Sequence, residues 1–88
     1  MKKVILGEEF DDDLREVLKD VLRELGATAL RKDWGVAGSQ ELETVEVSLR
    51  GRIVTIEAET YVGLSVSGHE DDVNEIAGLI AQRRSKAK

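Results

Sequence analysis

The only histidine of the chain, His69, has a serine and two aspartates near it in the sequence. Ser67, Asp71 and Asp72 would supply the other groups of a nucleophilic site. A catalytic triad, however, brings its members together from separate elements around an oxyanion site, whereas these residues share one short stretch. The segment Ser67-Gly68-His69-Glu70 fits the S-x-x-E capping box, in which serine and glutamate satisfy free N–H groups. We therefore predict a helix start here and no catalytic residue.

Two groupings of carboxylates invite a metal or acid–base interpretation. Asp11-Asp12-Asp13 are consecutive, whereas calcium loops alternate their ligands and need a glycine turn. We interpret them as acids at the positive end of a helix dipole. Glu46 and Glu57 share a sheet face, but an acid–base pair needs one carboxyl buried, and an open face leaves both ionised. The chain has no cysteine, which excludes thiolate metal sites. No metal, cofactor or catalytic residue is predicted.

The stretch from Gly35 to Gln40 contains two glycines and predicts a loop. It lacks the lysine and the spacing of a phosphate-binding loop, so we interpret it as a flexible connection, with small-ligand binding there as an alternative function. Trp34, the only tryptophan, directly precedes this loop. It either covers an edge of the core or anchors a protein interface, where tryptophan is enriched.

The elements that must position these residues are organised around Val45–Ser67. Alternate residues of a strand share one face of a sheet. The apolar sets of three runs are Val45, Val47 and Leu49; Val54, Ile56 and Ala58; and Val62, Leu64 and Val66. The opposite face carries mainly Thr, Ser and Glu, so we expect one face in the core and the other in water.

The turns set the register of these strands. A two-residue turn at Arg50-Gly51 pairs Val47 with Val54 and Val45 with Ile56, which puts both apolar sets on one face. A two-residue turn at Glu59-Thr60 would put the third set out of phase. We therefore expect a three-residue loop, Glu59-Thr60-Tyr61, or a bulge there. The pairs would be Ala58 with Val62, Ile56 with Leu64 and Val54 with Val66.

Two helices are predicted, over about 9–25 and 69–84. The first has the apolar stripe Phe10, Leu14, Val17, Leu18, Val21, Leu22 and Leu25. Asp11 or Asp12 is an alternative N-cap, and Gly26 is a natural stop. The second packs through Val73, Ile76, Ala77 and Ile80, and residues 85–88 are expected to form a disordered basic tail.

Ala27–Trp34 is a further predicted strand, with Thr28, Leu30 and Trp34 on one face, and Lys2–Leu6 is either a strand or an extended lead-in. The predicted fold is one α+β domain over residues 1–84. It is a two-layer sandwich with a mainly antiparallel sheet of three to five strands, including the meander 43–67, and both helices on one face.

The net charge is −5, which disfavours nucleic-acid binding because phosphate backbones repel it. The apolar run Val4–Leu6 is too short for a signal peptide or membrane span, so a soluble cytoplasmic protein without membrane contact is expected.

The leading hypothesis is a non-enzymatic interaction or regulatory module whose acidic helix face binds a basic protein. Its expected contact residues are Glu9, Asp12, Asp13, Glu16 and Trp34. The alternative is a homodimer formed through the outer sheet face or an edge strand.

Overall fold

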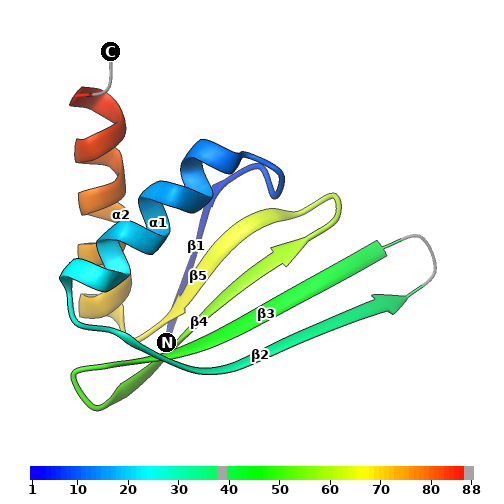
Figure 1. Ribbon diagram of the computed structural model, residues 1–88, viewed down its shortest axis with the longest axis horizontal. Helices are drawn as coiled ribbons and strands as arrows, with labels where there is room; N and C mark the ends of the chain where they lie inside the picture. Colours follow the sequence, from blue (N-terminus) through cyan, green and yellow to red (C-terminus); the bar gives the residue numbers. More distant parts are fainter. Residues whose placement is uncertain (38–39, 87–88) are drawn as a thin grey trace.

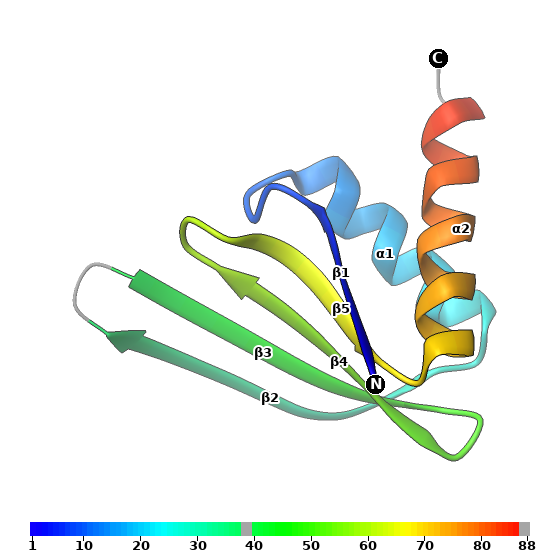
Figure 2. The ribbon, with the colours of Figure 1, turned by 180° about the vertical axis from the view of Figure 1, so that it is seen from behind.

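The computed structural model describes residues 1–37 and 40–86. The elements are β1 (Lys2–Gly7), α1 (Asp12–Glu24), β2 (Thr28–Ala37), β3 (Gln40–Leu49), β4 (Arg52–Glu59), β5 (Gly63–Gly68) and α2 (Glu70–Lys86). The strands form one antiparallel sheet in the order β1-β5-β4-β3-β2. Both helices lie on one face of it, and the β2–β3 hairpin extends beyond them (Figures 1 and 2). The predicted α+β sandwich is confirmed. Of the two alternatives for Lys2–Leu6, a strand or an extended lead-in, the structure has the strand.

The β3–β4 hairpin has the predicted register, with Val47 opposite Val54 and Val45 opposite Ile56. Its turn residues Arg50 and Gly51 have φ angles of 52° and 79°. Two successive positive φ angles are what a tight hairpin turn requires, because they match the twist of the strands. The dipeptide therefore determines this register locally.

Strands β4 and β5 pair as predicted, but the predicted register is wrong by two residues. Glu59 pairs with Gly63 and Ala58 with Leu64, so the three-residue loop is Thr60-Tyr61-Val62. A Cβ atom on Gly63 would lie 2.4 Å from the carbonyl oxygen of Gly7 on β1, and the φ angle of Gly63 is +115°. Only glycine fits there, so the contact with β1 sets where β5 begins. The shift by two residues keeps Leu64 and Val66 facing the core.

Helix α1 begins at Asp12, three residues later than the principal prediction. The carboxylate of Asp11 caps it by accepting the Leu14 N–H at 3.0 Å. At the other end, the N–H groups of Gly26 and Ala27 donate to the carbonyls of Arg23 and Leu22, with Gly26 at a φ angle of 79°. These two bonds form a Schellman motif, which explains why the helix stops there.

The start of α2 does not use the predicted capping box. Ser67 belongs to β5, and its hydroxyl donates to the Thr55 carbonyl across the sheet at 3.5 Å. The Nδ1 atom of His69 accepts the Asp71 N–H at 3.2 Å instead. Helix α2 continues through Lys86, which corrects the predicted disorder of residues 85 and 86, while 87 and 88 lie outside the described residues.

The β2–β3 hairpin is longer than predicted. Gly35 pairs with Leu42 and Ala37 with Gln40, so most of the predicted Gly35–Gln40 loop is strand, and residues 38 and 39 lie outside the described ranges. An irregularity between Ala29 and Arg31 shifts the register, so the predicted common face of Thr28, Leu30 and Trp34 is also wrong. Such a bulge adds an unpaired residue and reverses the side-chain phase.

The core lies between the helices and the inner face of the sheet. Its buried members are Leu14, Leu18 and Val21 of α1; Val73, Ile76 and Ile80 of α2; and Val47, Leu49, Val54, Ile56, Ala58, Leu64 and Val66 of the sheet. All are aliphatic, and the interior has no aromatic member among the described residues. The predicted apolar sets fill this core, except that Val45 is partly buried and Val62 is exposed.

Candidate functional site

The three aromatic side chains lie at the surface. Phe10 is 73% exposed, Trp34 63% and Tyr61 79%. Aromatic residues are the largest apolar side chains, and a small domain gains most when it buries them. Clustered exposed apolar groups, unlike isolated ones, indicate a contact surface. Phe10 was expected in the helix stripe, but it precedes α1 and therefore points away from the core.

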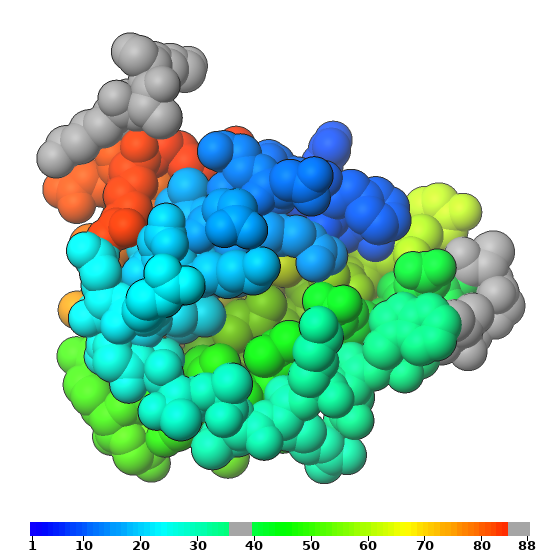
Figure 3. Space-filling model, viewed as in Figure 1, coloured from blue at the N-terminus to red at the C-terminus, as the bar shows by residue number. Residues whose placement is uncertain are grey.

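Two hollows lie side by side between α1 and the sheet, and Figure 3 shows this hollowed strip between α1 and β2. The acidic hollow, of about 260 Å³, is lined by Glu9, Phe10, Asp12, Arg15, Trp34, Glu41, Glu43 and Ala58. The apolar hollow, of about 240 Å³, is lined by Arg15, Leu18, Lys19, Leu22, Lys32, Glu43, Val45, Ile56, Ala58 and Leu64. Arg15, Glu43 and Ala58 belong to both, so the hollows form one continuous groove.

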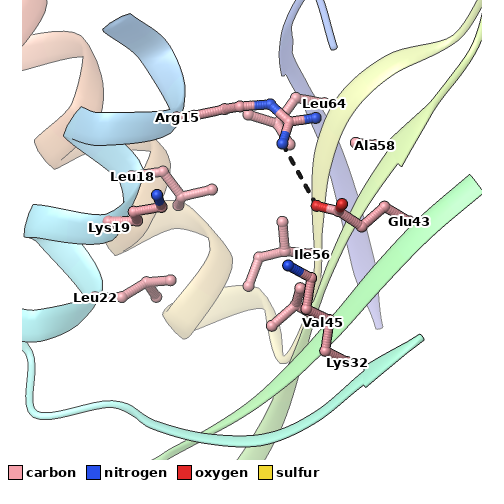
Figure 4. Close-up of a pocket in the computed structure, with 10 residues that line it drawn as sticks. All are labelled: Arg15, Leu18, Lys19, Leu22, Lys32, Glu43, Val45, Ile56, Ala58 and Leu64. Atoms are coloured by element: carbon pink, nitrogen blue, oxygen red, sulfur yellow. Dashed lines mark hydrogen bonds and ion pairs between the residues drawn. The ribbon is translucent and has the colours of Figure 1, made fainter. Parts of the chain in front are cut away.

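An ion pair crosses this groove. Nη1 of Arg15 lies 3.4 Å from Oε1 of Glu43, so it links α1 to β3 (Figure 4). The Nε–H of Arg15 also donates to the Glu9 carbonyl at 2.7 Å, which ties the segment before α1 to the helix. Both side chains of the pair are about one-third exposed, at 30% and 31%. The pair therefore marks the boundary between the two hollows.

The acidic hollow has a strong local excess of negative charge. Its lining includes four carboxylates, from Glu9, Asp12, Glu41 and Glu43, and the single cation Arg15. Arg15 is engaged by Glu43 and by a backbone carbonyl. The other three carboxylates face the hollow beside Trp34 and Phe10, so apolar and anionic groups are presented together.

The structure brings together three of the five predicted contact residues, Glu9, Asp12 and Trp34. Asp13 instead lies toward α2, with Oδ2 4.0 Å from Nη1 of Arg84. Glu16 is exposed and pairs with Lys19 at 3.4 Å. Neither lines the acidic hollow.

Sequence reasoning missed Phe10, Glu41 and Glu43 as members of this surface. The alternation in β3 carries a signal for the two glutamates, because residues 41, 43, 45, 47 and 49 share one strand face. Along this face, Glu41 and Glu43 come before the apolar residues Val45, Val47 and Leu49. A third hollow, of about 420 Å³, is lined by Ile5, Gly7, Glu8, Glu9, Phe10, Tyr61, Val62 and Gly63.

The polar groups near His69 do not converge on a reacting centre. The Ser67 hydroxyl faces the Thr55 carbonyl, and Asp72 is bound by Arg52. Hydrogen bonds from Arg52 hold the pKa of Asp72 below its usual value, although burial opposes this shift.

Glu46 and Glu57 pair in the strand ladder with Thr55 and Thr44, as predicted. Over residues 1–37 and 40–86, no three His, Asp or Glu side chains are grouped to hold a metal ion.

Comparisons with protein-family models, curated proteins and solved structures found no match. In the described segments, no helix combines the length and apolar character needed to cross a membrane. Nothing in these comparisons or in the described side chains points to an enzymatic reaction.

Proposed function

We propose that this protein is a non-enzymatic interaction module that binds a basic segment of another protein in the acidic hollow. The observation that supports this function is the joint exposure of Phe10 and Trp34 beside four carboxylates. The acidic helix face expected from the sequence contributes only in part. The binding surface extends from the segment before α1 across to β2 and β3.

The chemistry of this surface favours arginine-containing segments. A guanidinium group stacks on an aromatic face and forms paired hydrogen bonds with a carboxylate. Trp34 could provide the first interaction, and the neighbouring carboxylates could provide the second. Aromatic side chains also provide large contact areas, and they lose little conformational freedom when they bind. The net charge of −5 would steer a cationic partner toward the molecule. We expect this to happen in a reducing cytoplasm, since the chain has no cysteine.

The two alternatives have less support. Strand β2 is the long edge of the sheet, but it carries a register irregularity and the consecutive charges Arg31, Lys32 and Asp33. Bulges and charges on an edge discourage pairing with a second copy. The ligand-binding alternative relied on a Gly35–Gln40 loop, and most of that stretch is strand.

The direct test is selection from a displayed library of random peptides, followed by titration of the selected peptides with Trp34 fluorescence as the signal. Enrichment of arginine and lysine is expected, with affinity that falls as salt rises because exposed charges are screened. The double variant Glu9→Gln/Asp12→Asn should bind the peptides at least roughly fivefold more weakly, an effect in the range of two exposed ion pairs.

The matched control is Asp20→Asn, which removes an exposed acid of α1 that does not line the hollow. It should bind the selected peptides as the natural chain does. Selected peptides without an excess of basic residues, or equal loss of binding in the control, would contradict the proposed function.

A further inference from the structure

The apolar hollow differs in chemistry from its neighbour. Its aliphatic lining consists of Leu18, Leu22, Val45, Ile56, Ala58 and Leu64. Around this floor are three cations, Arg15, Lys19 and Lys32, and one acid, Glu43. The hollow therefore has an excess of positive charge in a chain whose net charge is −5.

Lys32 is the most informative of these cations. The register shift between Ala29 and Arg31 places it opposite Val45, on the face of the sheet that carries the helices. Arg15 is already paired with Glu43, and Lys19 pairs with Glu16. Within the described part of the chain, Lys32 has no carboxylate within ion-pair distance.

The arrangement around Lys32 resembles a site for an amphiphilic anion. Figure 4 shows Leu18 and Leu22 of α1 facing Ile56 and Val45 of the sheet across an open space, with the Lys32 amine reaching from β2 toward Ile56. An apolar ligand body on this floor would have a cation beside it. The volume of about 240 Å³ admits roughly eight groups of the size of a water molecule.

We propose that the apolar hollow binds a free aliphatic monocarboxylate of medium chain length. Its tail packs on the floor formed by Leu18, Leu22 and Ile56, and its carboxylate pairs with Lys32, with Lys19 at the rim. The occupant is a free acid rather than a lipid in a bilayer, because the hollow is recessed between α1 and the sheet. The apolar hollow shares Arg15, Glu43 and Ala58 with the acidic hollow, whereas the two lysines proposed to contact the carboxylate, Lys32 and Lys19, line only the apolar hollow.

The test compares three probes with the same eight-carbon tail, namely octanoate, 1-octanol and octylammonium, by amide chemical shifts in NMR titrations. Octanoate should bind saturably and most tightly, with shifts clustered at Leu18, Leu22, Lys32 and Val45. Lys32→Gln should weaken octanoate binding roughly fivefold and leave octanol unchanged, because an exposed ion pair contributes in this range. Lys3→Gln, on the opposite edge strand and the outer face, is the matched control.

A charge reversal makes the outcome independent of any folding defect. Lys32→Glu should prefer octylammonium to octanoate, a change of selectivity that a misfolded protein would not show. Equal binding of octanoate and octanol to the natural chain would overturn the proposal, as would shifts centred on Tyr61. So would unchanged octanoate binding in Lys32→Gln accompanied by new self-association, because Lys32 would then serve only to protect the edge strand.

Discussion

A carboxylate buried at the start of α2 ties that helix to the β3–β4 hairpin. Asp72 is 0% exposed, and it accepts hydrogen bonds from Nε and Nη2 of Arg52 at 2.8 and 2.7 Å. Nη2 of Arg50 lies 3.6 Å from the same carboxylate. The Arg52 side chain is 43% exposed, so the buried carboxylate is the partner that depends most on these hydrogen bonds. Asp72 is therefore a structural residue.

Asp72→Asn should lower the free energy of unfolding at pH 7 by about 1–3 kcal/mol, because a charge-assisted bidentate contact is lost. Asp71→Asn should change it by less than about 0.5 kcal/mol, since that side chain is 83% exposed. Urea denaturation measures both. Equal stability of the two variants would contradict the structural role of Asp72.

The same carboxylate predicts a dependence of stability on pH. Arg52 lowers the pKa of Asp72 below its ordinary value of 3.8, so the stabilisation is present above that pH. It is lost as the pH falls through the lower pKa of the folded state, because the unfolded chain takes up the proton first. The stability difference between the natural chain and Asp72→Asn should therefore shrink at pH values below 3.8, and a difference that grows there would refute this linkage.

The β4–β5 turn shows how one element sets the position of another. Gly63 begins β5 directly against the backbone of Gly7, and the neighbouring Tyr61 has a φ angle of 70°. This turn also presents Tyr61 and Val62 to solvent beside Phe10. The exposed position of these side chains therefore depends on the close contact between β1 and the start of β5.

Gly63→Ala should destabilise the protein by about 2 kcal/mol or more, because its Cβ would collide with a backbone carbonyl at an unfavourable φ angle. Gly78→Ala is the control, since it adds a Cβ within α2 where no atom lies within 4 Å. That change should stabilise the chain by about 0.5–1 kcal/mol. Thermal denaturation would show opposite shifts, and a neutral Gly63→Ala would count against the close approach of β1 and β5.

At the scale of the whole molecule, the radius of gyration is 12.6 Å. A compact chain of this length is expected to have a value of about 12 Å. The outer face of the sheet is mostly polar, although Ile5 and Ile53 are exposed on it at 57% and 56%. Because this face is mostly polar, we expect a monomer.

Light scattering should accordingly find a 9.7 kDa monomer over a wide concentration range. Replacing Arg31, Lys32 and Asp33 of β2 by threonine should produce association that rises with concentration, because an uncharged edge strand is open to pairing. A natural chain that is already dimeric at micromolar concentration would revive the homo-oligomer alternative.

The sequence by itself determined the parts of the fold that depend on neighbours along the chain. Alternation separated the inner and outer faces of the meander, and Arg50-Gly51 set the register of β3 against β4. The apolar stripe and Gly26 located most of α1 and its end. Three of the five predicted contact residues, Glu9, Asp12 and Trp34, line the acidic hollow, and their contact with a partner stays a prediction.

Only the tertiary structure decided which surfaces these residues share. The irregularity between Ala29 and Arg31 turned Lys32 and Trp34 toward the helices, and the contact of Gly63 with Gly7 moved the start of β5. Local patterns report the preferences of a segment, whereas these features arise from backbone pairing with distant strands. The pairing of distant strands therefore placed the acidic and apolar hollows beside each other.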